Sequence, residues 1–415
     1  MRLSPDDQAV LNRLAPRADA LVARAVDWCA INSGSRNLEG LERMRAVLAD
    51  ELAHLPGDVE SLELQASSEV GADGRERAQA HPDALRLTVR PNAPGQVVLT
   101  GHYDTVYPAE SLFQTVTTRA DGALHGPGIA DMKGGISVML AALEAFETHP
   151  ASGAVGYRVL LSPDEEIGSL ASAPLLAELG ASAHVGMTYE PAMADGALAG
   201  ARKGSGNFHV VVKGRAAHAG RDFTAGRNAI AAAARIATAL DSANGRQEGV
   251  TINVARIDGG SPLNMVPDTA VVRFNVRMPD AAAGAWARRA IADAMRAGEG
   301  DGLTVSLHGG FTRPAKPFNA AQAALFEAVR EAGALIGQQV SWKSSGGVCE
   351  GNNLFAAGLP NLDTLGVRGG DIHSENEHAW PDSFVERAQL SALILAKLAT
   401  GEIDGPALRA KMETR

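Results

Sequence analysis

The sequence predicts an α/β protein whose main domain contains a mostly parallel sheet and is interrupted by a smaller, inserted α+β domain. Two observations support this prediction. Apolar segments with strand character alternate with helical segments in the first half of the chain, which is typical of a layered α/β domain. Near Gly204 this order changes, and after Pro314 it resumes and runs to about Ala399. A chain of 415 residues has room for about two or three ordinary domains.

Residues 1–203 are expected to form the first part of the main domain. Apolar residues recur at helical spacing from Asp6 to about Ile31, and a second helix is expected over residues 38–55. Strands are expected at residues 85–90, 96–100, 157–161 and 184–188, with helices at 134–148 and 170–179. Residues 70–80 are polar and weakly patterned, which predicts a loop.

Residues 204–313 show a different order of elements. Strands are expected over residues 208–213, 250–257, 269–277 and 303–307, and helices over 225–240 and 281–297. The resulting order, β-α-β-β-α-β, is that of a ferredoxin-like unit, and about 100 residues are enough for a small independent domain. Residues 314–415 are then expected to complete the main domain.

Composition and charge narrow the possible partners and compartments. The net charge of −10 argues against nucleic acid or an anionic membrane as the main partner. The sequence has no apolar run near the ~20 residues that a membrane span needs, and no signal-peptide pattern at its start. Its two cysteines cannot form a disulfide framework or a thiolate zinc site. A cytoplasmic protein is therefore expected.

Polar side chains follow several of the predicted strands. His102 and Asp104 come after an apolar run and are two residues apart, so they face the same side of a strand. At the carboxyl end of a strand in an open α/β sheet, that side borders the usual ligand crevice. Asp131 stands just before a Lys-Gly-Gly run and a helix, and it could also simply cap that helix.

Further acids and a histidine complete this set. Glu165 and Glu166 lie beside a strand end, in a run of acids that could also be a solvated turn, and Glu190 follows another strand. His373 lies in a Gly-rich loop before the last long helix. Imidazole and carboxylate together suit zinc, cobalt or manganese. Five such ligands suit two metals about 3.5–4 Å apart that share one carboxylate.

The motifs HYDTV, GIADMKGG, SPDEEIGS, YEP and IHSENE together resemble those of the M20 family of dinuclear zinc hydrolases. This family includes glutamate carboxypeptidases, acetylornithine and succinyl-diaminopimelate deacylases, and aminoacylases. The motifs run in the family's order from about residue 98 to 378, and the domain insertion matches too. The resemblance implies a zinc-peptidase-like catalytic domain and an inserted dimerisation domain.

The resemblance implies a role for each ligand position. Two zinc ions per subunit, for which cobalt or manganese could substitute, would be held by five side chains. His102 and Glu190 would belong to one metal, and Glu166 and His373 to the other. Asp131 would bridge both, and the peptide bond after it is often cis in this family.

Three further residues receive catalytic roles from the resemblance. Asp104 would orient the imidazole of His102 through its other ring nitrogen. Glu165 would be the general base that later delivers the proton to the leaving amine. His218, which by itself reads as a structural histidine, would reach the active site of the partner subunit in a homodimer and stabilise the oxyanion.

The same resemblance indicates substrate contacts. Asn264 and Arg277 lie in the inserted domain, and Arg277 matches a residue that grips the substrate carboxylate. Arg313 could be a second carboxylate contact or a hinge salt bridge. Gly346 and Gly347 could let backbone N–H groups approach an anionic terminus of the substrate.

The expected function is hydrolysis of an amide or peptide bond next to a free carboxylate, as in a glutamate carboxypeptidase. The substrate would be a small peptide or an N-acyl amino acid. An alternative is a deacylase of the acetylornithine or succinyl-diaminopimelate type, which Glu190 favours because some carboxypeptidases have Asp there. A non-catalytic, ligand-binding relative is a remote alternative, because every expected ligand and the base are present. A Rossmann-type nucleotide site would need a Gly-rich turn directly after an early strand, which is not seen.

Overall fold

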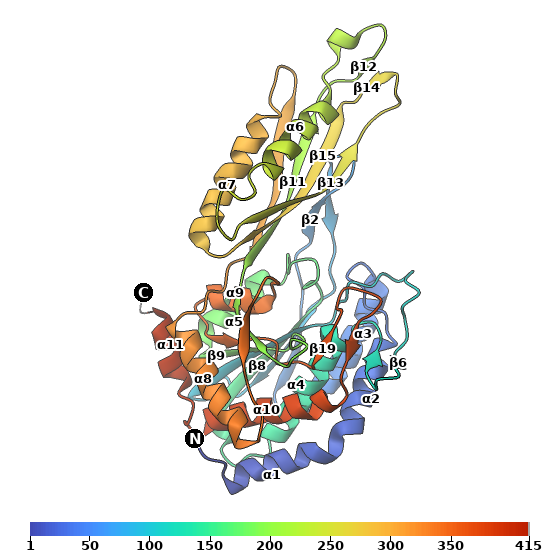
Figure 1. The fold of residues 1–415 in the computed structure, drawn as a ribbon. Helices are drawn as coiled ribbons and strands as arrows, with labels where there is room; N and C mark the ends of the chain where they lie inside the picture. Colours follow the sequence, from blue (N-terminus) through green and yellow to red (C-terminus); the bar gives the residue numbers. More distant parts are fainter. Residues whose placement is uncertain (414–415) are drawn as a thin grey trace.

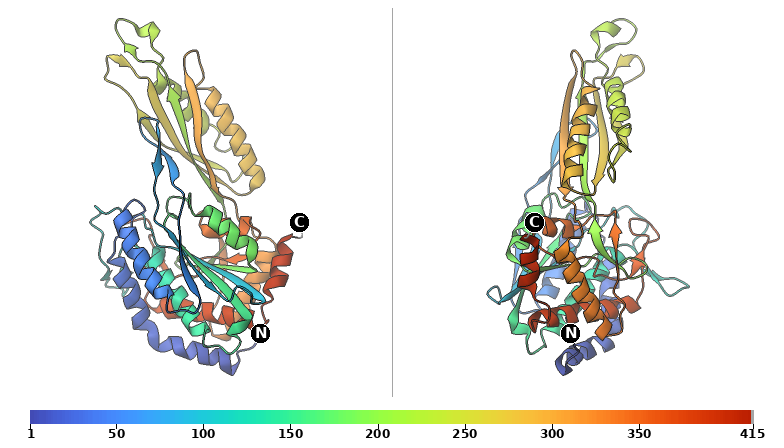
Figure 2. Two further views of the ribbon diagram at one scale, coloured as in Figure 1. Left: turned by 180° about the vertical axis from the view of Figure 1, so that it is seen from behind. Right: turned by 60° about the vertical axis from the view of Figure 1, so that its left-hand side comes forward.

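The computed structural model describes residues 1–413, which form a larger lobe with both termini and a smaller lobe (Figures 1 and 2). The six-stranded sheet of the larger lobe has the order β1 (Asp58–Leu62), β4 (Ala84–Val89), β8 (Val155–Ser162), β5 (Gly95–His102), β9 (Val185–Thr188) and β18 (Asn361–Leu362). The pairings from β8 to β18 are parallel, whereas β1, β4 and β8 pair antiparallel. The sheet is therefore mixed, but five of its six strands point the same way and only β4 is reversed, so it is mostly parallel, as the sequence predicts.

Helices cover both faces of this sheet, as the alternation of buried side chains along β5 indicates. Val97 and Leu99 belong to the large core beneath α4 (Gly134–Phe146) and α10 (Asp382–Ala399). Val98 faces the other way, into a second cluster with side chains of α5 (Ala173–Ser182) and α9 (Glu350–Ala356). Because successive strand residues point to opposite faces, one apolar run anchors both helical layers.

The predicted N-terminal helical run is divided in two. α1 (Pro5–Leu14) and α2 (Ala18–Cys29) are separated by the short 3₁₀ turn Ala15–Arg17. Pro16 lies in this turn, where it lacks the N–H donor that a continuous helix would need. At the start of α1, Ser4 and Asp7 accept each other's backbone N–H groups, which satisfies two donors at the helix end.

Residues 204–313 build the smaller lobe around a four-stranded antiparallel sheet. Its order is β13 (Thr251–Gly259), β15 (Thr269–Met278), β11 (Gly204–Lys213) and β16 (Thr304–Arg313). α6 (Ala229–Asp241) and α7 (Ala281–Arg296) pack on one face and enclose a separate apolar core. Apart from the short strands β12 (Ala217–His218) and β14 (Met265–Val266), the element order is β-α-β-β-α-β, as the sequence predicts.

The prediction of a loop over residues 70–80 is wrong. β2 (Ser67–Val70) and β3 (Glu76–Gln79) form an antiparallel hairpin that reaches from the larger lobe to the smaller one (Figures 1 and 2). Val70 packs against Val211 and Val271 on the sheet face opposite α6 and α7, and Lys213 Nζ donates a 2.7 Å hydrogen bond to the main-chain oxygen of Asp73. The strands are short and mostly exposed, so they lack the apolar alternation that would reveal them.

The remaining helices and strands complete the larger lobe. Helices α3 (Leu38–Leu52), α8 (Ala320–Leu335) and α11 (Gly405–Glu413) lie around it. Its small sheets contain β6 (Thr117–Thr118), β7 (Leu124–His125), β10 (Leu198–Arg202), β17 (Trp342–Ser345), β19 (Gly369–Gly370) and β20 (His378–Ala379). Within residues 1–413, no helix has the length and apolar character that crossing a bilayer requires.

Candidate metal centre

Three neighbouring parallel strands end at the same edge of the main sheet. β5 ends at His102, which is in register with Ser162 at the end of β8, and Thr100 is in register with Thr188 at the end of β9. The loops that follow β8 and β9 carry Glu165, Glu166 and Glu190. The shared strand direction therefore brings these acids to the side where His102 stands.

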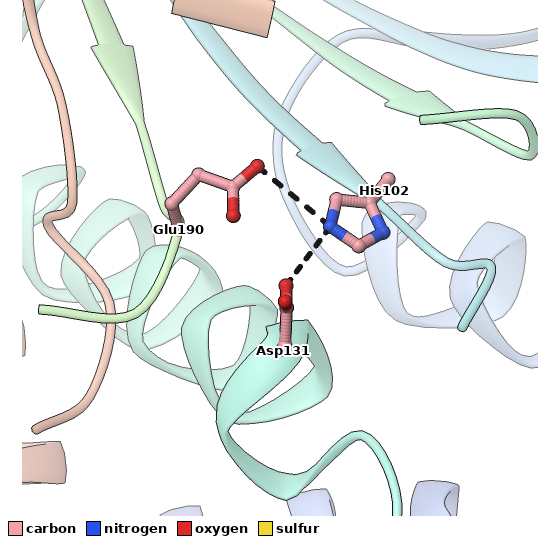
Figure 3. A group of neighbouring side chains, drawn as sticks. All are labelled: His102, Asp131 and Glu190. Atoms are coloured by element: carbon pink, nitrogen blue, oxygen red, sulfur yellow. Dashed lines mark hydrogen bonds and ion pairs between the residues drawn. The ribbon is translucent and has the colours of Figure 1, made fainter. Parts of the chain in front are cut away.

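One candidate ligand group contains His102, Asp131 and Glu190 (Figure 3). Nε2 of His102 lies 3.2 Å from Oδ1 of Asp131 and 3.7 Å from Oε1 of Glu190. All three side chains are buried. The same imidazole nitrogen thus faces two carboxylates, as expected of side chains that surround one cation.

A second group contains Asp131, Glu166 and His373. Nε2 of His373 lies 3.3 Å from Oδ2 of Asp131 and 3.1 Å from Oε2 of Glu166. The His373 side chain is 54% exposed, so this group borders solvent. The two oxygens of Asp131 face different histidines, and its carboxylate lies between the two groups.

Asp131 is not the cap of the following helix. α4 begins at Gly134, its N-cap position is Lys133, and no side chain caps it. The Asp131–Met132 peptide bond is cis, as the family resemblance implies. Lys133 is buried and donates to the carbonyls of Trp28 and Ile31, which ties this turn to the end of α2. The backbone therefore directs the Asp131 carboxylate into the cluster.

Several carboxylates lie close together and buried in this cluster, an arrangement that bound cations would stabilise. Burial and the nearby Asp131 carboxylate raise the pKa of Glu166 to about 8, and the same causes raise the pKa of Glu190 well above its usual value. Asp131 and Glu166 raise the pKa of His373 to about 11. Oε1 of Glu166 is buried without a hydrogen-bond partner among the described residues. The imidazole and carboxylate donors therefore fit two divalent cations that share Asp131.

Residues 98–397 match peptidase family M20/M25/M40. The chain belongs to this family. Two curated relatives that it resembles are carboxypeptidase G2 of Pseudomonas sp. (strain RS-16) and succinyl-diaminopimelate desuccinylase of Halorhodospira halophila. The first is 28% identical over 320 residues, which cover 74% of each chain. The second is 29% identical over 272 residues, which cover 62% of this chain and 70% of the other. This M20 chain is a hydrolytic enzyme.

Solved structures share the fold of this M20 hydrolase. A tripeptidase from Staphylococcus aureus superposes with a TM-score of 0.73 at 21% identity, covering 92% of this chain and 99% of the other. An M20 family metallo-carboxypeptidase from Sulfolobus solfataricus gives a TM-score of 0.70 at 16% identity, with the same coverage.

Asp104 connects His102 to the loop after β8. Its Oδ1 lies 3.3 Å from Nδ1 of His102 and accepts the N–H of Glu165 at 3.1 Å, and its Oδ2 accepts the N–H of Glu166 at 3.1 Å. Ser35, which the sequence analysis missed, donates its hydroxyl to Oδ2 at 2.8 Å. One buried carboxylate therefore contacts an imidazole and the backbone of two acids, and Nδ1 of His102 also lies 3.0 Å from the main-chain oxygen of Asp104.

A cavity of about 680 Å³ lies between the lobes of the M20 hydrolase. Both ligand groups border it, because Asp131, Glu166, Glu190 and His373 are among its lining residues. Glu165 and Arg313 also line it, and Arg313 Nη2 donates to Oε1 of Glu165 at 2.6 Å. Arg277 lines the smaller-lobe side. Its Nε donates to Oδ1 of Asn275 at 2.9 Å, while its Nη1 is buried without a hydrogen-bond partner among residues 1–413.

The structure does not bring every predicted site residue to this cavity. His218 and Asn264 are exposed at the far end of the smaller lobe, where β12 and β14 pair (Figure 1). Gly347 lines the cavity, but its N–H donates to the Ser345 hydroxyl at 3.1 Å. Gly346 is exposed and lies outside the lining residues. Within one chain, these positions leave His218 and Asn264 apart from the ligand groups.

Two buried carboxylates near the site, Asp363 and Glu377, were not predicted, although Arg202 was expected to act in hinge electrostatics. Arg202, at the crossing between the lobes, forms a two-pronged ion pair with Asp363 at 2.5 and 3.0 Å. Glu377 is buried four residues after His373 and contacts the Asp131 backbone. Glu377 is the last residue of the IHSENE motif, which could have pointed to a role for it. Asp363 lies outside all of the quoted motifs.

Proposed function

We propose that this M20 hydrolase is a two-metal enzyme that cleaves an amide or peptide bond next to a free carboxylate. The observation that carries the proposal is the position of Asp131, whose two oxygens face His102 and His373. The ligands are His102 and Glu190 for one metal, and Glu166 and His373 for the other. Two zinc ions per subunit suit these donors, with cobalt or manganese as substitutes.

The proposed chemistry uses Glu165 to move the proton. When bound, the two cations would acidify a shared water and polarise the substrate carbonyl. Glu165 accepts a proton from the attacking water and delivers it to the leaving amine. Two contacts fix the position of Glu165: the Arg313 guanidinium donates to its side chain, and the Asp104 carboxylate accepts its backbone N–H. Asp104 also keeps Nε2 of His102 directed at the ligand group.

Arg277 supports the choice of substrate class. Arg277 lines the cavity, and its Nη1 lacks a hydrogen-bond partner among residues 1–413, so a substrate carboxylate could supply the missing bond. We favour a glutamate-carboxypeptidase-like reaction, in which the product amino acid bears this carboxylate. The second candidate is an N-acyl amino acid deacylase, which the presence of Glu190 and the desuccinylase relatives favour. Release of glutamate, as opposed to release of acetate or succinate, separates the two candidates.

We also propose different roles for the two lobes. Residues 1–203 and 314–415 form the catalytic domain, and residues 204–313 form an inserted dimerisation domain. His218 and Asn264 are exposed at the end of the smaller lobe, where a second copy of the chain can meet them. We propose that the pair completes the active site of the partner subunit, His218 as an oxyanion donor and Asn264 as a substrate contact.

A hydrolysis screen on zinc-loaded protein tests the proposed function. Dipeptides and N-acyl amino acids with a free carboxylate should be cleaved, and their carboxamide analogues should react poorly. Glu165→Gln should lower kcat by about 10²–10⁴-fold while both metals stay bound. Glu178→Gln, which changes an exposed acid on α5, is the matched control and should retain wild-type turnover. Equal turnover by wild type and Glu165→Gln would remove Glu165 from its role.

A further inference from the structure

A second buried carboxylate lies directly behind Asp131. Oε1 of Glu377 accepts the backbone N–H groups of Ala130 at 2.9 Å and Asp131 at 3.0 Å. Its Oε2 accepts the N–H of Gly128 at 3.0 Å and the hydroxyl of Tyr107 at 2.7 Å. The Glu377 side chain is fully buried. Burial removes this carboxylate from water, which is costly for an isolated charge. Hydrogen bonds from four donors compensate for that cost.

Glu377 joins the three chain segments that carry most of the candidate ligands. Tyr107 follows His102 in the loop after β5, and Ala130 and Asp131 belong to the turn before α4. Glu377 itself lies in the loop between β19 and β20, which also carries His373. Its main-chain oxygen accepts the N–H of Gly126 at 3.2 Å, which adds a second link between the same two loops.

The hydrogen bond from the Asp131 N–H to Glu377 restrains the Asp131 side chain. The N–H that Glu377 accepts is attached to the Cα that carries the Asp131 side chain, so the bond limits where that carboxylate can stand. Each Asp131 oxygen must meet a different ligand group, His102 on one side and His373 on the other. Such constellations need supports that hold them within about 0.5 Å of the working geometry.

We propose that Glu377 is a positioning residue of the metal centre, which holds the 128–131 backbone so that Asp131 stays between the two ligand groups. This inference rests on the proposed function, because it takes Asp131 as a shared ligand. Glu377 touches no candidate metal position; it acts through the Asp131 backbone and through the loop that it shares with His373. Partners of this kind typically change metal affinity by about 10–100-fold when they are removed.

The test measures binding of Zn²⁺ alone to the metal-free, full-length protein, by competition with a chromophoric chelator. Glu377→Gln keeps the size of the side chain, but its amide NH₂ cannot accept from the N–H groups that it faces. We expect its affinity for Zn²⁺ to fall by about 10–100-fold. Tyr107→Phe removes one of the four donors to Glu377, together with the contact of the same hydroxyl with the Ser374 carbonyl, and should cost less, about a few-fold.

A matched variant separates positioning from general stability. Asp7→Asn also alters a buried carboxylate, but it lies on α1 and contacts Lys397. It should lower the thermal midpoint of the metal-free protein and leave Zn²⁺ affinity unchanged. With Co²⁺ as a second probe, Glu377→Gln should also change the visible absorption bands of the bound metal, which a loss of stability alone does not alter.

The possible results are distinct. Wild-type affinity and an unchanged Co²⁺ spectrum in folded Glu377→Gln would overturn the inference and leave the proposed function intact. If Glu377→Gln does not fold, Tyr107→Phe decides, and an unchanged affinity in that variant overturns the inference. Absence of metal binding by the wild type would remove the proposed function, and the inference with it.

Discussion

The guanidinium of Arg313 donates a 2.6 Å hydrogen bond to Oε1 of Glu165, although the two residues lie 148 positions apart in the chain. Arg313 is fully buried at the end of β16, the last strand of the smaller lobe, and its Nη1 also donates to Asn353 at 2.8 Å. Of its two predicted roles, an ion pair at the junction of the lobes is the contact present in this structure. The proposed base is thus held by a residue of the other lobe.

Removal of the Arg313 guanidinium should impair turnover more than substrate binding. Arg313→Met leaves Glu165 without the donor that fixes its rotamer, so we expect kcat to fall by about 10–10³-fold with a smaller change in KM. Steady-state kinetics on a substrate from the screen measures this. Arg90→Met is a matched control, because Arg90 forms an ion pair of the same 2.6 Å length with Glu147, away from the cavity. Equal losses in both variants would indicate a general effect on folding.

Much of the site could be predicted because parallel strands end at one edge of a sheet. His102, Glu166 and Glu190 follow neighbouring strands, so strand order alone places them on the same side. Asp131 and His373 come from loops without a fixed position relative to the sheet, so their place in the set depended more on the family motifs than on strand order. The order of the main elements in residues 204–313 was also predictable, since the two helices and the four strands of the main sheet are each at least 9 residues long.

Other features depend on tertiary contacts that local patterns do not encode. β4 is reversed because it pairs antiparallel with β8, and β1 pairs antiparallel with β4 in turn. Periodicity does not reveal whether a strand runs parallel or antiparallel. The β2–β3 hairpin is stabilised by Val211 and Val271 of the other lobe. Arg313 meets Glu165 only because the two lobes come together at this point.

Asp131 should control both metals, whereas His373 should control one. We expect wild-type protein to bind two equivalents of Zn²⁺ tightly, His373→Ala one, and Asp131→Ala neither, because both ligand groups contain Asp131. Metal content after gel filtration and titration of the metal-free protein measure this. Asp121→Ala, at an exposed acid in a nearby loop, should bind two equivalents. Tight binding of one equivalent by Asp131→Ala would contradict a shared ligand.

Arg277 should determine the affinity for carboxylate substrates. Arg277→Met removes the guanidinium whose Nη1 lacks a partner, and we expect KM to rise by about 10–100-fold, as for the loss of a charge-assisted hydrogen bond. The variant should cleave the carboxamide analogue as poorly as the wild type does. Arg273→Met changes an arginine on the same strand that is paired with Asp258, and it should keep the wild-type KM. An equal KM increase for the acid and its amide would argue against this role.

Asp7 should make stability depend on pH in the acidic range. Burial raises its pKa, but bonds from Ser4 and the Lys397 ammonium outweigh burial and hold the pKa below the ordinary 3.8. Asp7 therefore stabilises the folded protein at neutral pH, and this contribution is lost as pH falls from about 3.8 through the folded pKa. Asp7→Asn should cost about 1–3 kcal/mol at pH 7.

Thermal midpoints measured from pH 7 to pH 3 check this prediction. The difference between wild type and Asp7→Asn should shrink as the pH falls below about 3.8. Asp6→Asn changes the exposed neighbour on the same helix and should match the wild type at every pH. A difference that is constant across the whole range would show that the lost contact does not depend on the Asp7 charge.

His218 should act in the partner subunit's site, because it is exposed at the end of the smaller lobe, away from the cavity of its own chain. Glu165→Gln and His218→Ala should each have little activity as pure dimers. In a hybrid dimer, the site with an intact Glu165 receives an intact His218 from the other chain. Co-expression in equal amounts makes about half of the dimers hybrids with one working site each, so about a quarter of wild-type activity should return. If His218 acts within its own chain, both sites of the hybrid stay defective and no activity returns. Glu165→Gln co-expressed with the double variant Glu165→Gln/His218→Ala is the negative control, because no site then contains the base.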